Sequence, residues 1–157
     1  MFVAVFATVA IVMGSFAGCA SARSAKNEAE KTQAAQGKGT ILFVPHDDRP
    51  TSREQSAEAV EKLGYTVLMP PKEMLGGLEE GKPDELWQWA ASQAVRADAA
   101  VVSTDSIIYG GLVASRKHEL SEEELAERVG RIESLKKLNP KMKVYAFGSL
   151  MRTPSSG

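Results

Sequence analysis

The sequence predicts an α/β fold in which a parallel sheet of about four strands is covered by helices. Two observations lead to this prediction. Short, nearly continuous apolar segments alternate with longer amphipathic segments, and Gly or Pro residues separate them. Continuous apolar strands are typical of parallel sheets buried between helices, and such alternation implies right-handed crossovers. The same order of elements also fits the first part of a larger α/β domain or barrel.

The first strand is predicted at residues 41–44, where Pro45 ends a run of four apolar residues. Thr51 and Glu54 have the spacing of a capping box, so a helix is expected to begin there. Gly64 is expected to end this helix. The residues predicted to share its inward face are Ser56, Val60 and Leu63.

The remaining elements continue the alternation. The later strands are predicted at residues 65–69, 99–103 and 144–148. One helix is expected to open with Pro83 and run through Val95, and another to open with a capping box of Ser121 and Glu124. Their predicted inward residues are Leu86, Ala90 and Ala94 in the first, and Leu125, Val129, Ile132 and Leu135 in the second. Residues 104–116 are expected to form a loop, and residues 149–157 no further element.

The chain divides into three predicted parts. Residues 1–19 are typical of a lipoprotein-type signal segment, because residues 1–22 carry no charged side chain. Residues 20–39 are small, polar and without apolar periodicity, which predicts a flexible tether. Residues 40–157 are the predicted α/β domain.

The segment from Phe16 to Cys19 resembles the lipobox of bacterial lipoproteins, in which small residues precede a Cys that receives a diacylglycerol. Cys19, the only Cys, is the predicted lipidation site. We therefore expect an exported protein anchored in the cell-envelope membrane. Ala20 and Ser21 differ from the Asp-type retention signal, which favours the outer membrane in a Gram-negative cell. The alternatives are a plain membrane anchor, or a signal peptide cut elsewhere with Cys19 incidental.

Charge and Cys content exclude several classes of function. A net charge of −1 disfavours nucleic-acid binding. A single Cys excludes an internal disulfide and any multi-Cys metal site. No cofactor is predicted, since Gly110-Gly111 lacks the spacing of a dinucleotide or phosphate-binding loop. A serine hydrolase is unsupported because no Gly-x-Ser-x-Gly motif is present.

Ligand chemistry in such a fold belongs on the loops at the carboxyl ends of the strands. The first of these loops contains Asp47, Asp48 and Arg49, which can orient a hydroxyl, bind a cation or supply an acid or base. Adjacent side chains point in different directions, so one Asp is expected to face the site while the other is held by Arg49 or caps the helix. The simplest structural alternative is an Asp48–Arg49 pair.

The loop after the third strand contains a second set of candidate residues. Asp105 follows the strand, so it is expected to converge with Asp47 and Asp48 above the sheet. The predicted binding residues of this and the next loop are Tyr109, Gly110, Gly111, Arg116 and Arg152. Tyr109 can stack on a sugar ring, the glycines permit close approach to a ligand, and an Arg can clamp a carboxylate or phosphate. The alternative is a structural turn with Tyr109 packed and Arg116 on the surface.

Metal binding is a minor alternative, and no metal site is predicted. His46 and His118 are too few for a His-based site. A hard cation such as Mg²⁺ or Ca²⁺ would need Asp47, Asp48 and Asp105 together.

Five segments resemble, in order, the bacterial family called domain of unknown function four-one-two-seven. They are ILFVPHDDRP, PPKEMLGG, KPDELWQW, ADAAVVSTDSIIYGGLVASR and VYAFGSLMR. The DDRP and YGGLVASR segments are the specific ones. The resemblance covers about residues 40–154, and members of that family are several times longer, which implies that the domain is truncated at its C-terminus here. Members typically have Leu in place of His46. The family supplies no reaction that can be carried over.

The leading functional hypothesis is a lipid-anchored hydrolase of glycosidase type that acts on carbohydrate or envelope material. Asp47, Asp48 and Asp105 are its candidate catalytic residues, since glycosidases use two carboxylates. The alternatives are a non-catalytic lipoprotein whose loops hold a sugar or a carboxylate-bearing ligand, and an inactive fragment whose outer strand is an uncovered edge. The predicted partners are the membrane and a small-molecule or glycan ligand; oligomeric state is not predicted.

The lipobox interpretation predicts that Cys19→Ser abolishes incorporation of a labelled fatty acid into the protein when it is expressed in a bacterium. Only the Cys thiol can accept the diacylglycerol, so Ser21→Ala should be labelled like the wild type. Persistent labelling of Cys19→Ser would exclude this anchor.

Overall fold

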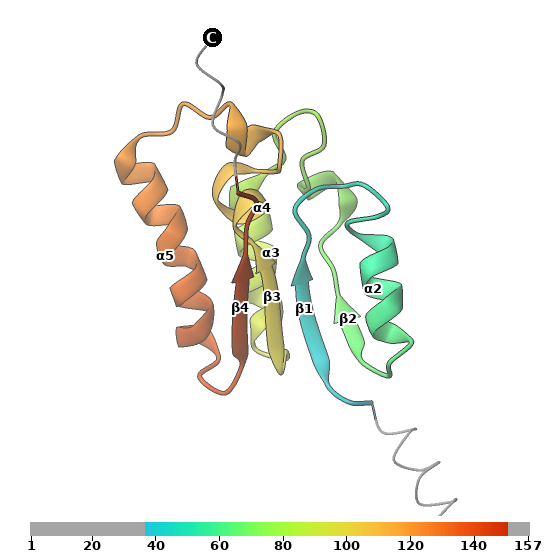
Figure 1. The fold of residues 1–157 in the computed structure, drawn as a ribbon. Coiled ribbons are helices and arrows are strands. Elements are labelled where there is room, and N and C mark those ends of the chain that lie inside the picture. The colour runs from blue at the N-terminus through green and yellow to red at the C-terminus, as the bar shows by residue number, and fades with distance from the viewer. Residues whose placement is uncertain (1–36, 151–157) are drawn as a thin grey trace, which may run out of the picture. The chain divides into compact units, whose positions relative to one another are not determined.

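The computed structural model describes residues 37–150 as a four-stranded parallel sheet with helices, so the predicted α/β class is confirmed. The strands are β1 (Thr40–Val44), β2 (Thr66–Leu68), β3 (Ala99–Ser103) and β4 (Lys143–Phe147). They lie in the order β2-β1-β3-β4 (Figure 1), and every pairing is parallel. All four strands therefore end at the same edge of the sheet.

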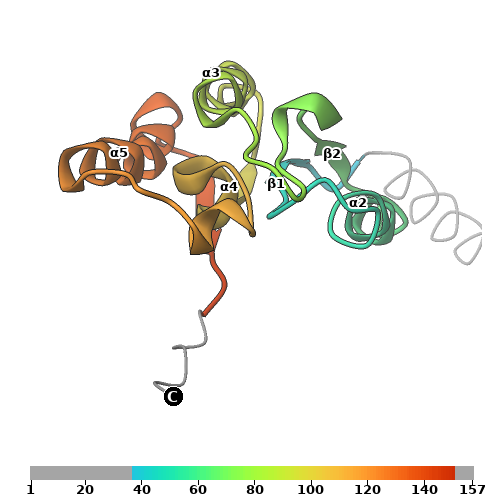
Figure 2. The same cartoon turned by 90° about the horizontal axis from the view of Figure 1, so that it is seen from above.

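Helices lie on both sides of this sheet. They are α2 (Glu54–Glu61), α3 (Pro83–Ala94), α4 (Thr104–Tyr109) and α5 (Glu122–Leu138), with short 3₁₀ helices η1 (Lys72–Met74) and η2 (Ala114–Arg116). Seen from above, α2 lies on one side of the sheet, and α3, α4 and α5 lie on the other (Figure 2). Right-handed crossovers explain this, because the chain moves in one direction from β1 to β2 and in the opposite direction afterwards.

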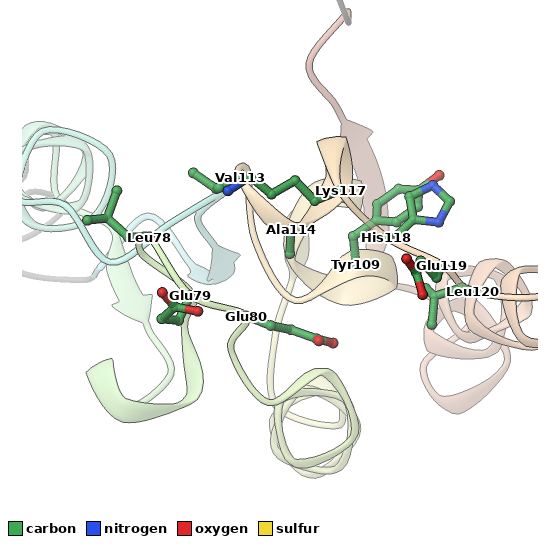
Figure 3. Close-up of a pocket in the computed structure, with 10 residues that line it drawn as sticks. All are labelled: Leu78, Glu79, Glu80, Tyr109, Val113, Ala114, Lys117, His118, Glu119 and Leu120. Atoms are coloured by element: carbon green, nitrogen blue, oxygen red, sulfur yellow. The ribbon is translucent and has the colours of Figure 1, made fainter.

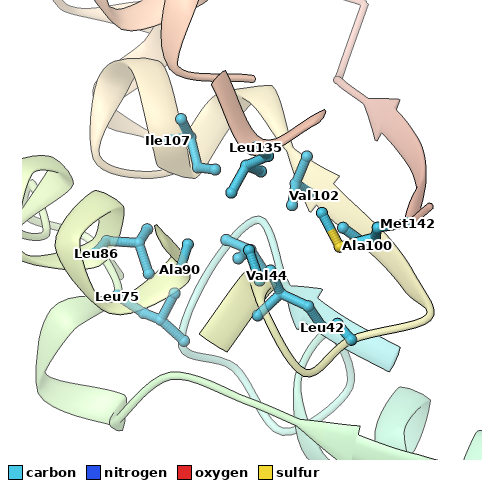
Figure 4. Packing of buried hydrophobic residues seen from close by; sticks show 12 residues of the cluster. Leu42, Val44, Leu75, Leu86, Ala90, Ala100, Val102, Ile107, Leu135 and Met142 are labelled. Atoms are coloured by element: carbon cyan, nitrogen blue, oxygen red, sulfur yellow. The ribbon is translucent and has the colours of Figure 1, made fainter. Parts of the chain in front are cut away.

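The hydrophobic core fills the space between the sheet and the α3–α5 side (Figure 4). The strand residues that point into it are Leu42, Val44, Ala100 and Val102, and all four are fully buried. The helices contribute Leu86, Ala90 and Ala94 of α3, Ile107 of α4 and Leu135 of α5. Full burial of each large aliphatic side chain stabilises the fold by about 1.5–3 kcal/mol. The predicted inward face of α3 is confirmed.

The opposite face of the sheet is covered less completely. The β4 strand forms one edge of the sheet, and its side chains Tyr145 and Phe147 are 57% and 37% exposed. Within residues 37–150, β4 is therefore an outer strand with no strand beyond it.

The helix α2 differs from its prediction. It begins at Glu54 with Arg53 as the N-cap residue, and no side chain caps it. The predicted Thr51–Glu54 capping box is wrong because residues 49–53 form a turn of their own, in which the Ser52 and Arg53 N–H groups donate to the Arg49 carbonyl. The helix ends before Leu63, which is 61% exposed, and Ala57 is its buried residue.

The helix α5 has the predicted capping box, and of its predicted inward residues Leu135 is buried and Ile132 packs against the core. The Glu124 N–H donates to Ser121 Oγ at 3.2 Å, and the Ser121 N–H donates to Glu124 at 3.0 Å. Val129, predicted to point inward, is 53% exposed. Arginines make the contacts there: Arg128 donates to the Ile108 carbonyl at 2.7 Å, and Arg131 pairs with Asp84 at 2.6 Å.

The segment predicted as a loop at residues 104–116 contains both α4 and η2. Its helix is only six residues long and is buried through Asp105, Ser106, Ile107 and Ile108. A helix this short has no periodicity to detect, since its stability comes from tertiary packing.

Two glycine-containing loops meet at the carboxyl edge of the sheet. Gly110 and Gly111 have φ values of +80° and +147°, and the Gly81 N–H donates to the Gly110 carbonyl at 2.8 Å. A Cβ atom added at Gly76 would collide with that same carbonyl oxygen. The sequence predicted that Gly110 and Gly111 let the backbone come close to a ligand. In the structure they lie close to the backbone of the loop that contains Gly76 and Gly81.

Several predicted features lie outside residues 37–150, namely the signal segment, Cys19, most of the tether and Arg152. At the end of the predicted tether, the Lys38 N–H already donates to the Gly64 carbonyl at 2.8 Å. Within the described residues, no helix combines the length and apolar character needed to cross a membrane.

We predict that Gly76→Ala lowers the free energy of unfolding by about 1–3 kcal/mol, because the added methyl group would force two backbones apart. Gly130→Ala is the matched control: nothing lies within 4 Å of a Cβ at this position in α5. It should stabilise the protein by about 0.5–1 kcal/mol. Denaturant unfolding measures both, and an unchanged stability of Gly76→Ala would show that the loops are not in close contact.

Candidate functional site

The candidate site is a cavity at the carboxyl ends of β1 and β3. These strands pair in register up to Val44 and Val102, so the segments that follow them begin side by side. The cavity has a volume of about 250 Å³. The residues that line it are Asp47, Asp48, Arg49, Gly77, Leu78, Leu112, Val113 and Arg116. Four of the residues predicted from the sequence therefore meet around one space: Asp47, Asp48, Arg49 and Arg116.

Backbone hydrogen bonds hold the three loops of this site together. The Asp48 N–H donates to the Gly76 carbonyl at 3.0 Å, and the Leu112 N–H donates to the His46 carbonyl at 3.0 Å. The loop after β1 is thus attached to both glycine-containing loops. The walls of the cavity are fixed by backbone contacts rather than by side chains alone.

Asp47 is buried and is bound by Arg49. Its carboxylate accepts the Arg49 backbone N–H at 3.1 Å and the Arg49 Nε–H at 2.6 Å, and it also pairs with Nη2. The residue is only 2% exposed, whereas the Arg49 side chain is 58% exposed. The prediction that Arg49 holds one Asp is confirmed, but the specific Asp48–Arg49 pair is wrong. Asp47 lies two residues before Arg49, so its carboxylate can reach both the backbone N–H and the guanidinium of Arg49.

These contacts determine the ionisation of Asp47. Burial acts to raise the pKa of Asp47, but the Arg49 side chain, Ser52, the Arg49 N–H and the His46 charge together outweigh it. The pKa of Asp47 is therefore lowered from its ordinary value of 3.8. A carboxyl group held ionised in this way is poorly suited to act as a general acid near neutral pH.

Asp48 is the more accessible of the two carboxylates. Its side chain is 33% exposed, and Lys72 Nζ lies 4.0 Å from its Oδ2. A Cβ atom at Gly77 would lie 2.8 Å from Asp48 Oδ1, so the absence of a side chain there makes room for the carboxylate. Asp48 is the carboxylate in this cavity that a ligand can reach.

Asp105 is not part of this cavity. It is 4% exposed in the first turn of α4, and its Oδ2 accepts the Ser149 N–H at 3.1 Å. The expected convergence of three carboxylates above the sheet is not found. Within residues 37–150, no group of three or more His, Cys, Asp or Glu side chains is placed to hold a metal ion.

His46 supports the loop rather than the cavity. Its Nε2 lies 3.1 Å from Ser52 Oγ and 3.4 Å from Asp47 Oδ2, and its ring meets the edge of Phe147 at 6.4 Å between centroids. Both polar partners share one ring nitrogen, which differs from a catalytic triad, where Ser and Asp contact opposite nitrogens. The sequence offered no signal for the Ser52 contact, which depends on the turn before α2.

Arg116 faces the cavity from η2 without a partner among the described residues. It is exposed, and its guanidinium makes no ion pair or hydrogen bond with any residue from 37 to 150. Because Arg49 is paired with Asp47, Arg116 is the cation in this lining that has no partner among residues 37–150. The alternative that placed Arg116 on the surface agrees with its exposure. The structure shows in addition that this exposed residue lines the cavity.

Tyr109 lines a second cavity of about 240 Å³ next to the first (Figure 3). The two cavities share Leu78 and Val113. The other residues of the second cavity are Glu79, Glu80, Ala114, Lys117, His118, Glu119 and Leu120. Sequence reasoning missed Glu79 and Glu80, although their position in the loop after β2, at the same sheet edge, was the available signal.

These features define the class of protein: an α/β protein with a small parallel sheet and a polar, loop-built cavity at the carboxyl edge. Residues 41–157 match the model of the family described as protein of unknown function (DUF4127), over the N-terminal part of that model. The chain belongs to this family, and the resemblance found in its motifs is confirmed. No curated protein and no solved structure matches the chain.

Asp47→Asn should lower the free energy of unfolding at pH 7 by about 1–3 kcal/mol, since it removes a buried charge-assisted hydrogen bond. A lowered pKa stabilises the fold above the ordinary Asp value, and this stabilisation is lost as the pH falls through the folded-state value. The difference between variant and wild type should therefore shrink below about pH 4.

Asp48→Asn is the matched control for this prediction. Its carboxylate is partly exposed and its ion pair with the exposed Lys72 is long, at 4.0 Å, so the change should alter stability by less than about 1 kcal/mol. Urea unfolding at several pH values measures both variants. A pH-independent difference for Asp47→Asn would contradict the assignment.

Proposed function

We propose that this chain forms a ligand-binding module that takes a small hydroxylated anion, of the sugar-acid type, in the cavity between Asp48 and Arg116. The single observation that carries this proposal is the exposed Arg116 guanidinium, which has no partner among residues 37–150 and lines the same cavity as Asp48. A guanidinium can bind a carboxylate through two parallel hydrogen bonds.

The remaining lining of the cavity suits the rest of such a ligand. Asp48 provides carboxylate oxygens that accept hydrogen bonds from hydroxyl groups. Leu78, Leu112 and Val113 provide apolar surface for the carbon skeleton. A site with one cationic side, one acceptor side and an apolar wall favours a hydroxylated carboxylate over a purely apolar molecule.

Hydrolysis of a glycan is the second candidate. It is favoured by Asp48, a reachable carboxylate in a loop-built cavity, with Glu79 and Glu80 lining the adjoining one. Asp47 is less suited to the reaction because Arg49 occupies it, and Asp105 because it is buried and bonded to Ser149. A hydrolase would therefore use Asp48 with a carboxylate of the neighbouring loop as its pair.

We propose further that the module is exported and held at the cell envelope through lipid on Cys19. The support is the lipobox-like sequence around the only Cys of the chain. In this proposal the site lies outside the cytoplasm, where glycans of the cell envelope are the expected source of its ligand.

Calorimetric titration of the full chain with glucuronate tests the binding proposal. Arg116→Gln should weaken glucuronate binding by about tenfold or more, because it removes a charge-assisted contact. Arg96→Gln is the matched control: Arg96 is also exposed, but it lies before β3, at the opposite end of that strand. Equal binding by wild type and Arg116→Gln, or none by either, would overturn the proposal.

The same preparations separate binding from catalysis. Incubation with uronic-acid-containing envelope glycan should give no new reducing ends if the protein only binds. Product formation that Asp48→Asn abolishes would instead establish the hydrolase candidate.

A further inference from the structure

We propose that the ligand site has a second subsite at Tyr109, so that the ligand is an oligosaccharide of at least two sugar units with its acidic unit beside Arg116. This inference rests on the proposed function and extends it. The carrying observation is that the Tyr109 cavity and the Arg116 cavity share two wall residues, Leu78 and Val113. In this proposal the two adjoining cavities, of about 240 and 250 Å³, are occupied by one longer ligand.

The second cavity contains an aromatic pair. The rings of Tyr109 and His118 lie 4.7 Å apart between centroids with their planes tilted by 34°. Figure 3 shows the two rings together on one side of the cavity, where the end of α4 and the segment after η2 carry them. The half-buried Tyr109 is held in place by its helix, and its hydroxyl makes no hydrogen bond with any residue of 37–150. An amphipathic ring with a free polar end suits the face and hydroxyl rim of a sugar.

The charges around this cavity define which sugar unit it takes. Glu79 and Glu80 lie along the 76–81 loop, and Glu119 follows His118 (Figure 3). Lys117 is the cation among the lining residues. The balance is negative, so a carboxylate placed here would be repelled, whereas neutral hydroxyl groups can donate to the glutamates. The acidic unit therefore belongs in the Arg116 cavity and a neutral sugar in the Tyr109 cavity.

Calorimetric titration with two probes tests this subsite on the full chain. The probes are glucuronate, a single acidic sugar, and cellobiouronate, a disaccharide of glucuronate and glucose. The wild type should bind cellobiouronate about tenfold more tightly than glucuronate, since the second ring adds an aromatic contact. Tyr109→Ala should lose this gain while keeping its affinity for glucuronate, and Tyr109→Phe should retain most of the gain.

Tyr145→Ala is the control for loss of a tyrosine ring, because Tyr145 is exposed on β4 and lines neither cavity. It should bind both probes like the wild type. Equal affinity of the wild type for the two probes, or an unchanged gain in Tyr109→Ala, would overturn the subsite while leaving the Arg116 proposal standing. Loss of glucuronate binding in Tyr109→Ala would overturn the separation into two subsites. Failure of the wild type to bind glucuronate, or indifference to Arg116→Gln, would overturn the proposed function itself.

Discussion

The arrangement of the site depends on the close backbone contact between the two glycine-containing loops. Gly76 and Gly81 lie against the Gly110 carbonyl at a distance that leaves no room for side chains. Because the first of these loops also accepts the Asp48 N–H, and the second leads to Leu112 and its bond with His46, the contact aligns all three loops over β1 and β3. Glycine is used here so that main chain can lie against main chain, and the space left beside that contact becomes the cavity.

The sequence predicted the elements whose signals are local. The strand at residues 99–103 was found with its predicted ends, and the Ser121 capping box and the inward face of α3 were also found, because each depends on neighbouring residues only. The failures have tertiary causes. The α4 helix is too short to show a period and is stabilised by burial. Val129 of α5 is exposed, and Arg128 and Arg131 add contacts to those of Leu135 because they reach groups on α4 and at the start of α3.

The sequence predicted which residues line the candidate site better than it predicted the contacts between them. Placement at strand ends brought Asp47, Asp48, Arg49 and Arg116 to one cavity, as the rule for parallel sheets implies. Which carboxylate Arg49 would bind depended on the turn before α2, and the exclusion of Asp105 depended on its bond to Ser149. The two pairs of residues therefore differ in role. Asp47 and Arg49 bind each other and stabilise the loop after β1, whereas Asp48 and Arg116 remain accessible to a ligand.

The uneven cover of the sheet has a consequence for its dynamics. The pair β1–β3 lies in the middle and carries the fully buried side chains, whereas β4, in the part of the chain that the structure describes, has a neighbour on one side only and is largely exposed. Amide hydrogens along β4 are therefore expected to exchange with solvent through local opening, ahead of those of β3. The loops that contain Asp48 and Arg116 follow the central strands β1 and β3. Local opening of β4 therefore leaves these two walls of the cavity in place.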